Sequence, residues 1–311
     1  MDLDELTKLN MNTSMCAPNL TDSKYFNIEE HHTCFTKHEL LSIVNAFNDY
    51  IINKSLCDKS INGNIICIPV GNLITVNFND SIKEIWFKIY DKFKDFCNYE
   101  SCWVNLTFIN EIHDKKLINK LRYFTFKPKF YNNRNKWLNT QDIDYIMQQY
   151  QKLYDDFLYI GTEPCDFYTI KNVNYNAICN TNKVGVIFNL DTSKQIGSHW
   201  TSLFIDNTNR HLYYFDSTGK NPNKYIDKFI KNYPKEYIKH YNKKDITQYK
   251  SDKLVFTIYI NKKVHQKGTS ECGVYSIYFL IKKIKTDDPI NNKRITDKSM
   301  KNFRKYIFNY N

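Results

Sequence analysis

The pattern of apolar and polar residues predicts helices in the first part of the chain. Apolar side chains recur at three- and four-residue intervals over residues 36–53 and again over 81–96, which is the periodicity of amphipathic helices. Thr36 and Glu39, three residues apart, are typical of a capping box at the start of the first helix. Residues 103–109 alternate and are predicted to form a strand. We therefore expect a separate, α-rich N-terminal region.

Strand patterns dominate the second part of the chain. The polar turn at residues 207–210 separates two of these strands, which we expect to form a β-hairpin. Helices around a mostly antiparallel central sheet make an α+β domain. Strands are predicted at residues 184–190, 199–206, 211–216 and 254–260, and helices at 137–154, 223–231, 272–285 and 297–308.

A change in composition separates the two parts. Residues 127–136 (KPKFYNNRNK) are basic, rich in asparagine and prone to turns, as segments between domains often are. The sequence therefore predicts an N-terminal accessory region or arm over residues 1–126 and a second domain over residues 127–311.

The formal net charge of +11 arises in the second part, where 31 basic residues stand against 17 acidic ones. Such an excess can attract DNA or an acidic protein partner. The basic residues are scattered, however, and form no long block. A solvated cationic surface is the favoured interpretation, with weak binding of DNA or an acidic partner as the alternative.

Cysteine and histidine usage predicts free thiols and no metal or cofactor. The nine cysteines form no regular framework, the first residues show no signal peptide, and no apolar run is long enough to cross a membrane. These features indicate a protein that is not secreted and that acts in a reducing compartment. The candidate zinc ligands lack paired spacings; they are His31, His32, Cys34, His38, Cys16, Cys57, Cys67, Cys97 and Cys102.

Cys272 is placed where a loop gives way to the apolar helix predicted over residues 272–285. At a helix N-terminus, unpaired N–H groups and the helix dipole favour an anion, and a thiolate is the reactive form of cysteine. Gly273 leaves the sulfur uncrowded for an approaching peptide. A small cysteine buried at a helix start is also common without such chemistry, so a base must be found before Cys272 is assigned as a nucleophile.

His199 and Asp216 supply that base and a carboxylate to orient it. His199 begins the first strand of the predicted hairpin and Asp216 ends the second. If Asp206 opposes His211 across the turn, Asp216 faces Thr201, two positions from His199 on the same face. Such diagonal neighbours are about 7–8 Å apart at the backbone, within reach of converging side chains. A carboxylate placed there holds the imidazole tautomer and stabilises the imidazolium.

His265 is an alternative base. It lies in the loop of the nucleophile itself, which would have to fold back tightly, and no carboxylate is placed to orient it. His199 is therefore the favoured base.

His199, Asp216 and Cys272 lie in three sequence motifs, GSHWTSLFID, YYFDSTGKNP and HQKGTSECGVYS, which are followed by a fourth, RITDKSMKNFR. Together these motifs resemble the ubiquitin-like-protein (SUMO) protease superfamily of cysteine proteases, which includes the adenovirus endopeptidase. Within it, the polyprotein-maturation proteases of large cytoplasmic DNA viruses look most similar. The resemblance covers about residues 137–308.

The resemblance implies roles for further residues. Gln266 matches the family's oxyanion residue, and losing one oxyanion donor typically costs about 2.7–4 kcal/mol of barrier. Trp200 and Trp137 match the tryptophans that line the two walls of the substrate cleft. Two flat indoles would leave a slot that admits residues without side chains, which implies cleavage after Gly-Gly. Core packing is the alternative role for both tryptophans.

The resulting expectation is a thiol endopeptidase that processes viral structural polyproteins at Gly-Gly motifs, in the host cytoplasm or the virion. The alternatives are a protease that removes SUMO, ubiquitin or a related modifier, and a non-catalytic binding module with the same fold.

Overall fold

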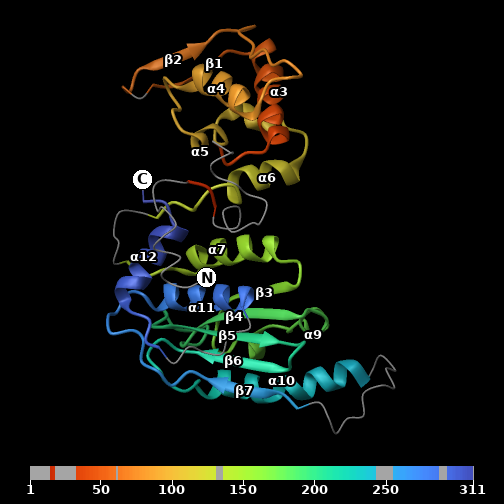
Figure 1. Cartoon of the computed structure of the whole chain (residues 1–311), viewed down its shortest axis with the longest axis vertical. Helices are drawn as coiled ribbons and strands as arrows, with labels where there is room; N and C mark the ends of the chain where they lie inside the picture. The colour runs from red at the N-terminus through yellow and green to blue at the C-terminus, as the bar shows by residue number, and fades with distance from the viewer. Residues whose placement is uncertain are drawn as a thin grey trace. The chain divides into compact units, whose positions relative to one another are not determined.

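The computed structural model describes residues 15–17, 33–60, 62–130, 136–242, 255–286 and 293–310. The chain divides into two compact units, with the change between Pro128 and Lys129 (Figure 1). Among the described residues, no helix is long and apolar enough to span a membrane.

The N-terminal unit is mainly helical. Its first helix begins as the sequence predicts, since Thr36 and Glu39 form both bonds of a capping box. Its core contains three fully buried rings, Phe47, Phe93 and Phe108, whose centroids are 5.1–5.5 Å apart. The elements are α3 (Lys37–Asn53), β1 (Leu56–Lys59), β2 (Ile65–Ile68), α4 (Ile82–Phe93), α5 (Glu100–Trp103), η1 (Thr107–Glu111) and α6 (Lys115–Tyr123).

The strand predicted over residues 103–109 is wrong. This segment ends α5, passes through a turn and enters the 3-10 helix η1. Buried and exposed residues do alternate from Val104 to Phe108, as the sequence pattern suggested. Successive short turns produce this alternation, which a pattern of so few residues does not separate from a strand.

The expectation that all cysteines stay as thiols is also wrong. Disulfides join Cys16 to Cys34, Cys57 to Cys67 and Cys97 to Cys102, all in the N-terminal unit. The second of these links residues directly opposite each other on β1 and β2. Pairs at such irregular spacings meet only in the folded chain, which is why their sequence showed no framework. The other three cysteines, Cys165, Cys179 and Cys272, are in no disulfide, and all lie in the second unit.

The second unit is built on a five-stranded mixed sheet in the order β3-β4-β5-β6-β7. The two central pairings are antiparallel and the pairing at each edge is parallel. The hairpin has the predicted register, with Asp206 opposite His211. The strands are β3 (Phe157–Pro164), β4 (Lys183–Asn189), β5 (Trp200–Asp206), β6 (His211–Phe215) and β7 (Thr257–Ile260).

Helices cover both faces of this sheet (Figure 1). Alternate strand residues such as Ile187 and Phe204 pack with α7, α11 and α12, whereas Val186 and Leu203 pack with α8, α9 and α10. The α+β class and the helical N-terminal region are therefore confirmed. The helices are α7 (Thr140–Leu153), α8 (Phe167–Ile170), α9 (Tyr175–Asn180), α10 (Lys224–Asn242), α11 (Cys272–Lys285) and α12 (Asp297–Ile307).

Candidate active site

The β5–β6 hairpin brings His199 and Asp216 together. His199 directly precedes β5 and Asp216 directly follows β6, and because the strands are antiparallel these positions lie at the same edge of the sheet. Nε2 of His199 lies 2.9 Å from Oδ1 of Asp216. The imidazole is 18% exposed and the carboxylate is fully buried, so solvent and salt screen this pair less than a surface pair.

Two residues that the sequence analysis missed, Thr218 and Asn261, hold Asp216 in place. The backbone N–H and the hydroxyl of Thr218 both donate to Oδ1 of Asp216, at 2.7 and 2.8 Å. The amide of Asn261 donates to the main-chain oxygen of Asp216 at 2.7 Å. Burial raises the pKa of Asp216, but the bonds from His199 and Thr218 outweigh it and lower the pKa overall. The motif Asp-x-Thr directly after a strand was a signal for Thr218, since Asp side chains often bond the backbone two residues on.

Cys272 is the first residue of α11, as predicted, and it is 1% exposed. The N-cap residue, Glu271, makes no side-chain bond to the helix N-terminus. Cys272 lies beside His199, close enough to raise the pKa of its imidazole. Since Nε2 of the ring is bonded to Asp216, Nδ1 is the nitrogen left for the thiol. The structure thus brings together the three residues that the sequence singled out.

The charge state of His199 follows from its neighbours. Burial lowers the pKa of His199, but hydrogen bonds to Asp216 and Cys272 and the charges of both groups raise it to about 9. The ring is therefore protonated at neutral pH. A protonated imidazole beside a cysteine is an arrangement that activates the sulfur as a nucleophile.

Gln266 lies in the loop before α11 and is bonded to the turn that follows Asp216. Its Oε1 accepts from the hydroxyl of Ser217 at 2.6 Å, and its Nε2 donates to the main-chain oxygen of Gly268 at 2.8 Å. The side chain is nearly buried. One amide hydrogen is used by Gly268, so the other remains for a substrate oxygen.

The two predicted tryptophans differ in exposure. Trp200 is buried and its indole N–H donates to the main-chain oxygen of Leu138 at 2.9 Å, whereas Trp137 is 43% exposed. A Cβ on Gly273 would lie 3.2 Å from atoms of both Leu138 and Trp200. Gly273 is thus needed for close packing of α11, which is a more specific reason than leaving the sulfur uncrowded.

His265 is buried in a different role. Its Nδ1 accepts the backbone N–H of Ile295 at 3.0 Å, and its main-chain oxygen accepts from Arg294. Burial and the positive charges of Lys263 and Arg294 lower the pKa of His265 to about 4. A neutral ring anchored in this way does not serve as a base for Cys272.

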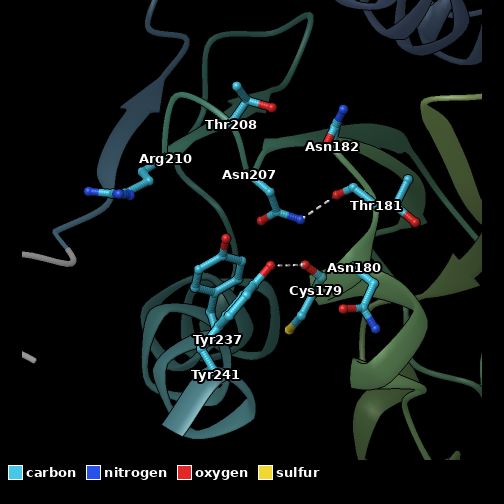
Figure 2. Close-up of a pocket in the computed structure, with 9 residues that line it drawn as sticks. All are labelled: Cys179, Asn180, Thr181, Asn182, Asn207, Thr208, Arg210, Tyr237 and Tyr241. Carbon is cyan, nitrogen blue, oxygen red and sulfur yellow. Dashed lines mark hydrogen bonds between the residues drawn. The ribbon is translucent and has the colours of Figure 1, made fainter. Parts of the chain in front are cut away.

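A cavity of about 260 Å³ lies at the opposite end of the hairpin from His199 (Figure 2). Two bonds across it are shown, from Asn207 to the main-chain oxygen of Thr181 and from Tyr241 to that of Cys179. Its lining, all of it described, contains no histidine or carboxylate to act on the Cys179 thiol. The lining residues are Cys179, Asn180, Thr181, Asn182, Asn207, Thr208, Arg210, Tyr237 and Tyr241.

Metal ligands were not predicted, and the described residues hold no group of three or more His, Cys, Asp or Glu side chains arranged to bind an ion. Cys16, Cys34, Cys57 and Cys67, which the sequence analysis had weighed as zinc ligands, are used in disulfides. His31 and His32 lie outside the described residues.

Comparison with protein families decides the affiliation of the chain. Residues 104–311, more than half of its length, match the family described as the Ulp1 protease family, C-terminal catalytic domain. The chain belongs to the Ulp1 protease family. It is therefore a cysteine protease, a hydrolase, as the sequence predicted. The match begins within the N-terminal unit and extends to residue 311.

Relatives of this Ulp1-family protease occur in viruses. A protein of Acanthamoeba polyphaga mimivirus named as a thiol protease is 30% identical over 287 residues, which cover 90% of this chain and 87% of the relative. A cysteine protease of African swine fever virus is 22% identical over 240 residues, 68% of this chain and 83% of the relative. A crystal structure of the African swine fever virus protease shares the fold, with a TM-score of 0.54, 21% identity and coverage of 76% of this chain and 94% of that one.

Proposed function

We propose that this Ulp1-family protease cleaves after Gly-Gly-type motifs, with Cys272 as nucleophile and His199 as the base and acid. In this mechanism the thiolate attacks the scissile carbonyl and the developing oxyanion is held by Gln266 and the backbone N–H of Cys272. His199 then protonates the leaving amine, and water releases the acyl group from the sulfur. Asp216 keeps the ring of His199 oriented and stabilises its charge.

The observation that carries the proposal is the hydrogen-bonded pair of Asp216 and His199 beside Cys272, which begins a helix. Each member is buried or nearly so, which keeps water from competing for the bonds. A nucleophile, a base in contact with it and a group that orients the base are the parts that acyl transfer requires.

The packing around Gly273 supports the Gly-Gly preference. Trp200 and Leu138 lie against this glycine, and Trp137 is the residue before Leu138, which places a second indole within reach of the same cleft in the proposed arrangement. Flat rings on either side of a peptide exclude substrate residues that have side chains. Glycine is the residue that such a slot admits.

Polyprotein processing during virion maturation is the leading role, because a viral thiol protease is similar to this chain over 90% of its length. The alternative, removal of a ubiquitin-like modifier, also has support, since some African swine fever virus relatives are named SUMO-1 cysteine proteases. Both roles use a protein substrate and the same site chemistry.

Substrate turnover separates the two roles. The purified full chain is incubated with fluorogenic Gly-Gly-Xaa peptides and with folded SUMO and ubiquitin carrying the same C-terminal reporter. Cleavage of short peptides at rates comparable to the folded modifiers supports an endopeptidase that reads a linear motif. Turnover of the folded modifiers alone contradicts the polyprotein role. The Cys272→Ala variant is the control and is expected to be inactive on every substrate.

A further inference from the structure

We propose that Ser217 is a positioning residue of the reaction, whose hydroxyl holds the amide of Gln266 in the orientation that presents an N–H to the substrate. The inference rests on the proposed role of Gln266 as an oxyanion donor. It concerns a residue that follows Asp216 directly in the chain and does not touch the thiol–imidazole pair itself.

The contacts of Ser217 all lead to the loop that carries Gln266. Its hydroxyl donates to Oε1 of Gln266 at 2.6 Å. Its main-chain oxygen accepts the backbone N–H groups of His265 and Gln266, at 2.8 and 2.9 Å. Ser217 is 1% exposed and Gln266 is 6% exposed, so water has little access to either partner.

The orientation of the amide follows from which groups can donate. The main-chain oxygen of Gly268, 2.8 Å from Nε2, accepts hydrogen bonds and cannot donate them. A flipped Gln266 amide would set Oε1 against that carbonyl, two acceptors with no proton between them. The NH2 group must therefore face Gly268, and Oε1 must face Ser217, which becomes the donor.

Ser217 affects how strongly the Gln266 amide donates hydrogen bonds as well as how the amide is oriented. A donor on Oε1 polarises the amide and makes its N–H groups better donors, because bonds in a buried chain reinforce one another. Without the hydroxyl, Oε1 of Gln266 would be buried with no partner at that position. Only the bond to Gly268 would then hold the amide in the geometry in which it meets the oxyanion.

The turn that contains Ser217 also serves Asp216. The backbone N–H of Gly219 closes it onto the main-chain oxygen of Asp216 at 2.9 Å, and Thr218 binds the carboxylate. A Cβ on Gly219, whose φ is +74°, would lie 2.7 Å from the main-chain oxygen of Lys262, so the turn sits closely against this segment. One short turn thus fixes both the residue that orients the base and the residue that orients the oxyanion donor.

The test compares Ser217→Ala with Ser202→Ala. Ser202 is an equally buried serine on β5, and its hydroxyl has no hydrogen-bond partner among the residues that the structure describes. With a Gly-Gly fluorogenic peptide, Ser217→Ala is expected to lower kcat by about tenfold with little change in KM, a fraction of the roughly 10²–10³-fold expected for Gln266→Ala. Ser202→Ala is expected to keep the parent kcat.

Alkylation of Cys272 by iodoacetamide, followed by mass analysis of its peptide, needs no oxyanion donor. Ser217→Ala should therefore keep the parent alkylation rate and pH profile. In a Gln266→Ala background, Ser217→Ala should cause no further loss of kcat, because its effect passes through the missing amide.

Three results would overturn the inference: an unchanged kcat in Ser217→Ala, an altered alkylation profile, or the same tenfold loss in the Gln266→Ala background. If Gln266→Ala itself keeps the parent kcat, the oxyanion assignment under the proposed function fails first. Loss of kcat in Gln266→Ala without loss in Ser217→Ala leaves that assignment standing and rejects the inference alone.

Discussion

The indole N–H of Trp200 donates to the main-chain oxygen of Leu138 at 2.9 Å, so the first residue of β5 is tied to the segment that leads into α7. The same two residues lie within 3.2 Å of the position that a Cβ on Gly273 would occupy. The contacts among Trp200, Leu138 and Gly273 therefore set the distance between α11 and the segment that contains Trp137.

The hydrogen bond from Trp200 to Leu138 should contribute measurably to the free energy of unfolding. Trp200→Phe leaves the Leu138 oxygen without its donor in a buried place, and we expect a loss of about 1–3 kcal/mol in the free energy of unfolding. Trp137→Phe is the matched control, since that indole is 43% exposed, and its effect should lie within about 0.5 kcal/mol. Urea unfolding followed by circular dichroism measures both. Equal losses in the two variants would contradict the account.

Gly273→Ala tests the close packing of α11. A methyl group there meets Leu138 and Trp200 at 3.2 Å, tighter than ordinary van der Waals contact, so one of them must shift. We expect a destabilisation of about 1–3 kcal/mol and a lower kcat, because α11 begins with the nucleophile. Thermal unfolding and peptide cleavage measure the two effects. Gly268→Ala is the control, since its Cβ would meet nothing closer than 3.9 Å. If the Gly273→Ala protein has the stability of the parent, Leu138 and Trp200 can move to accept the methyl group, and the predicted close packing is contradicted.

The pH dependence of activity should follow His199. Its pKa of about 9 keeps the ring protonated at neutral pH, so kcat/KM is expected to fall as the pH rises past about 9. Asp216→Asn removes a charge that raises this pKa while burial continues to lower it, and the alkaline limb should move to lower pH. Asp227→Asn on the surface of α10 is the control. An unchanged pH profile in Asp216→Asn would contradict the conclusion that Asp216 raises the pKa of His199.

The shifted pKa values of His199 and Asp216 also make the free energy of unfolding depend on pH. Because the pKa of His199 in the folded protein lies above its ordinary value of 6.5, its contribution to folding is complete below about pH 6.5 and is lost as the pH rises through about 9. Asp216 has a lowered pKa, so its contribution is present above its ordinary range near pH 4 and is lost as the pH falls. Urea unfolding of the parent and of Asp216→Asn across this range measures both effects.

Thiol counting tests the disulfides of the N-terminal unit. Under denaturing conditions without reductant, Ellman's reagent should find three thiols per chain, and after reduction it should find nine. The Cys57→Ser/Cys67→Ser double variant should keep the count of three before reduction and give seven after it. Nine thiols in the unreduced parent would contradict the pairing. The compartment in which the protein acts stays a prediction.

The sequence could place His199, Asp216 and Cys272 near one another because the position of each depends on local structure. The hairpin register placed Asp216 near His199, and the loop-to-helix change placed Cys272 at the start of α11. Thr218 and Asn261 were missed because they bond the carboxylate and the main-chain oxygen of Asp216. These oxygens require protein donors only because folding buries Asp216, and the sequence does not show that burial. The predicted weak binding of DNA or an acidic partner stays a prediction.

Elements with interrupted patterns were harder to predict. Strand β3 was missed since its register shifts between Tyr159 and Thr162, around Gly161 with φ +138°, and this irregularity breaks the alternation of a strand. Helix α10 extends past the predicted end at residue 231 and contains Pro234, a residue that ordinarily weakens a helix interior. Tertiary packing of Tyr233 and Tyr237 stabilises the extension.

Covalent labelling with an electrophilic peptide ending in Gly-Gly tests the central claim most directly. The full chain is treated with the probe, digested under conditions that preserve the label, and the modified cysteine is identified by mass spectrometry. We predict that Cys272 is labelled in the native protein, that Cys165 and Cys179 are not, and that His199→Ala slows the labelling strongly. Labelling of a different cysteine, or equal labelling of the native and unfolded protein, would contradict the assignment of Cys272 as the nucleophile.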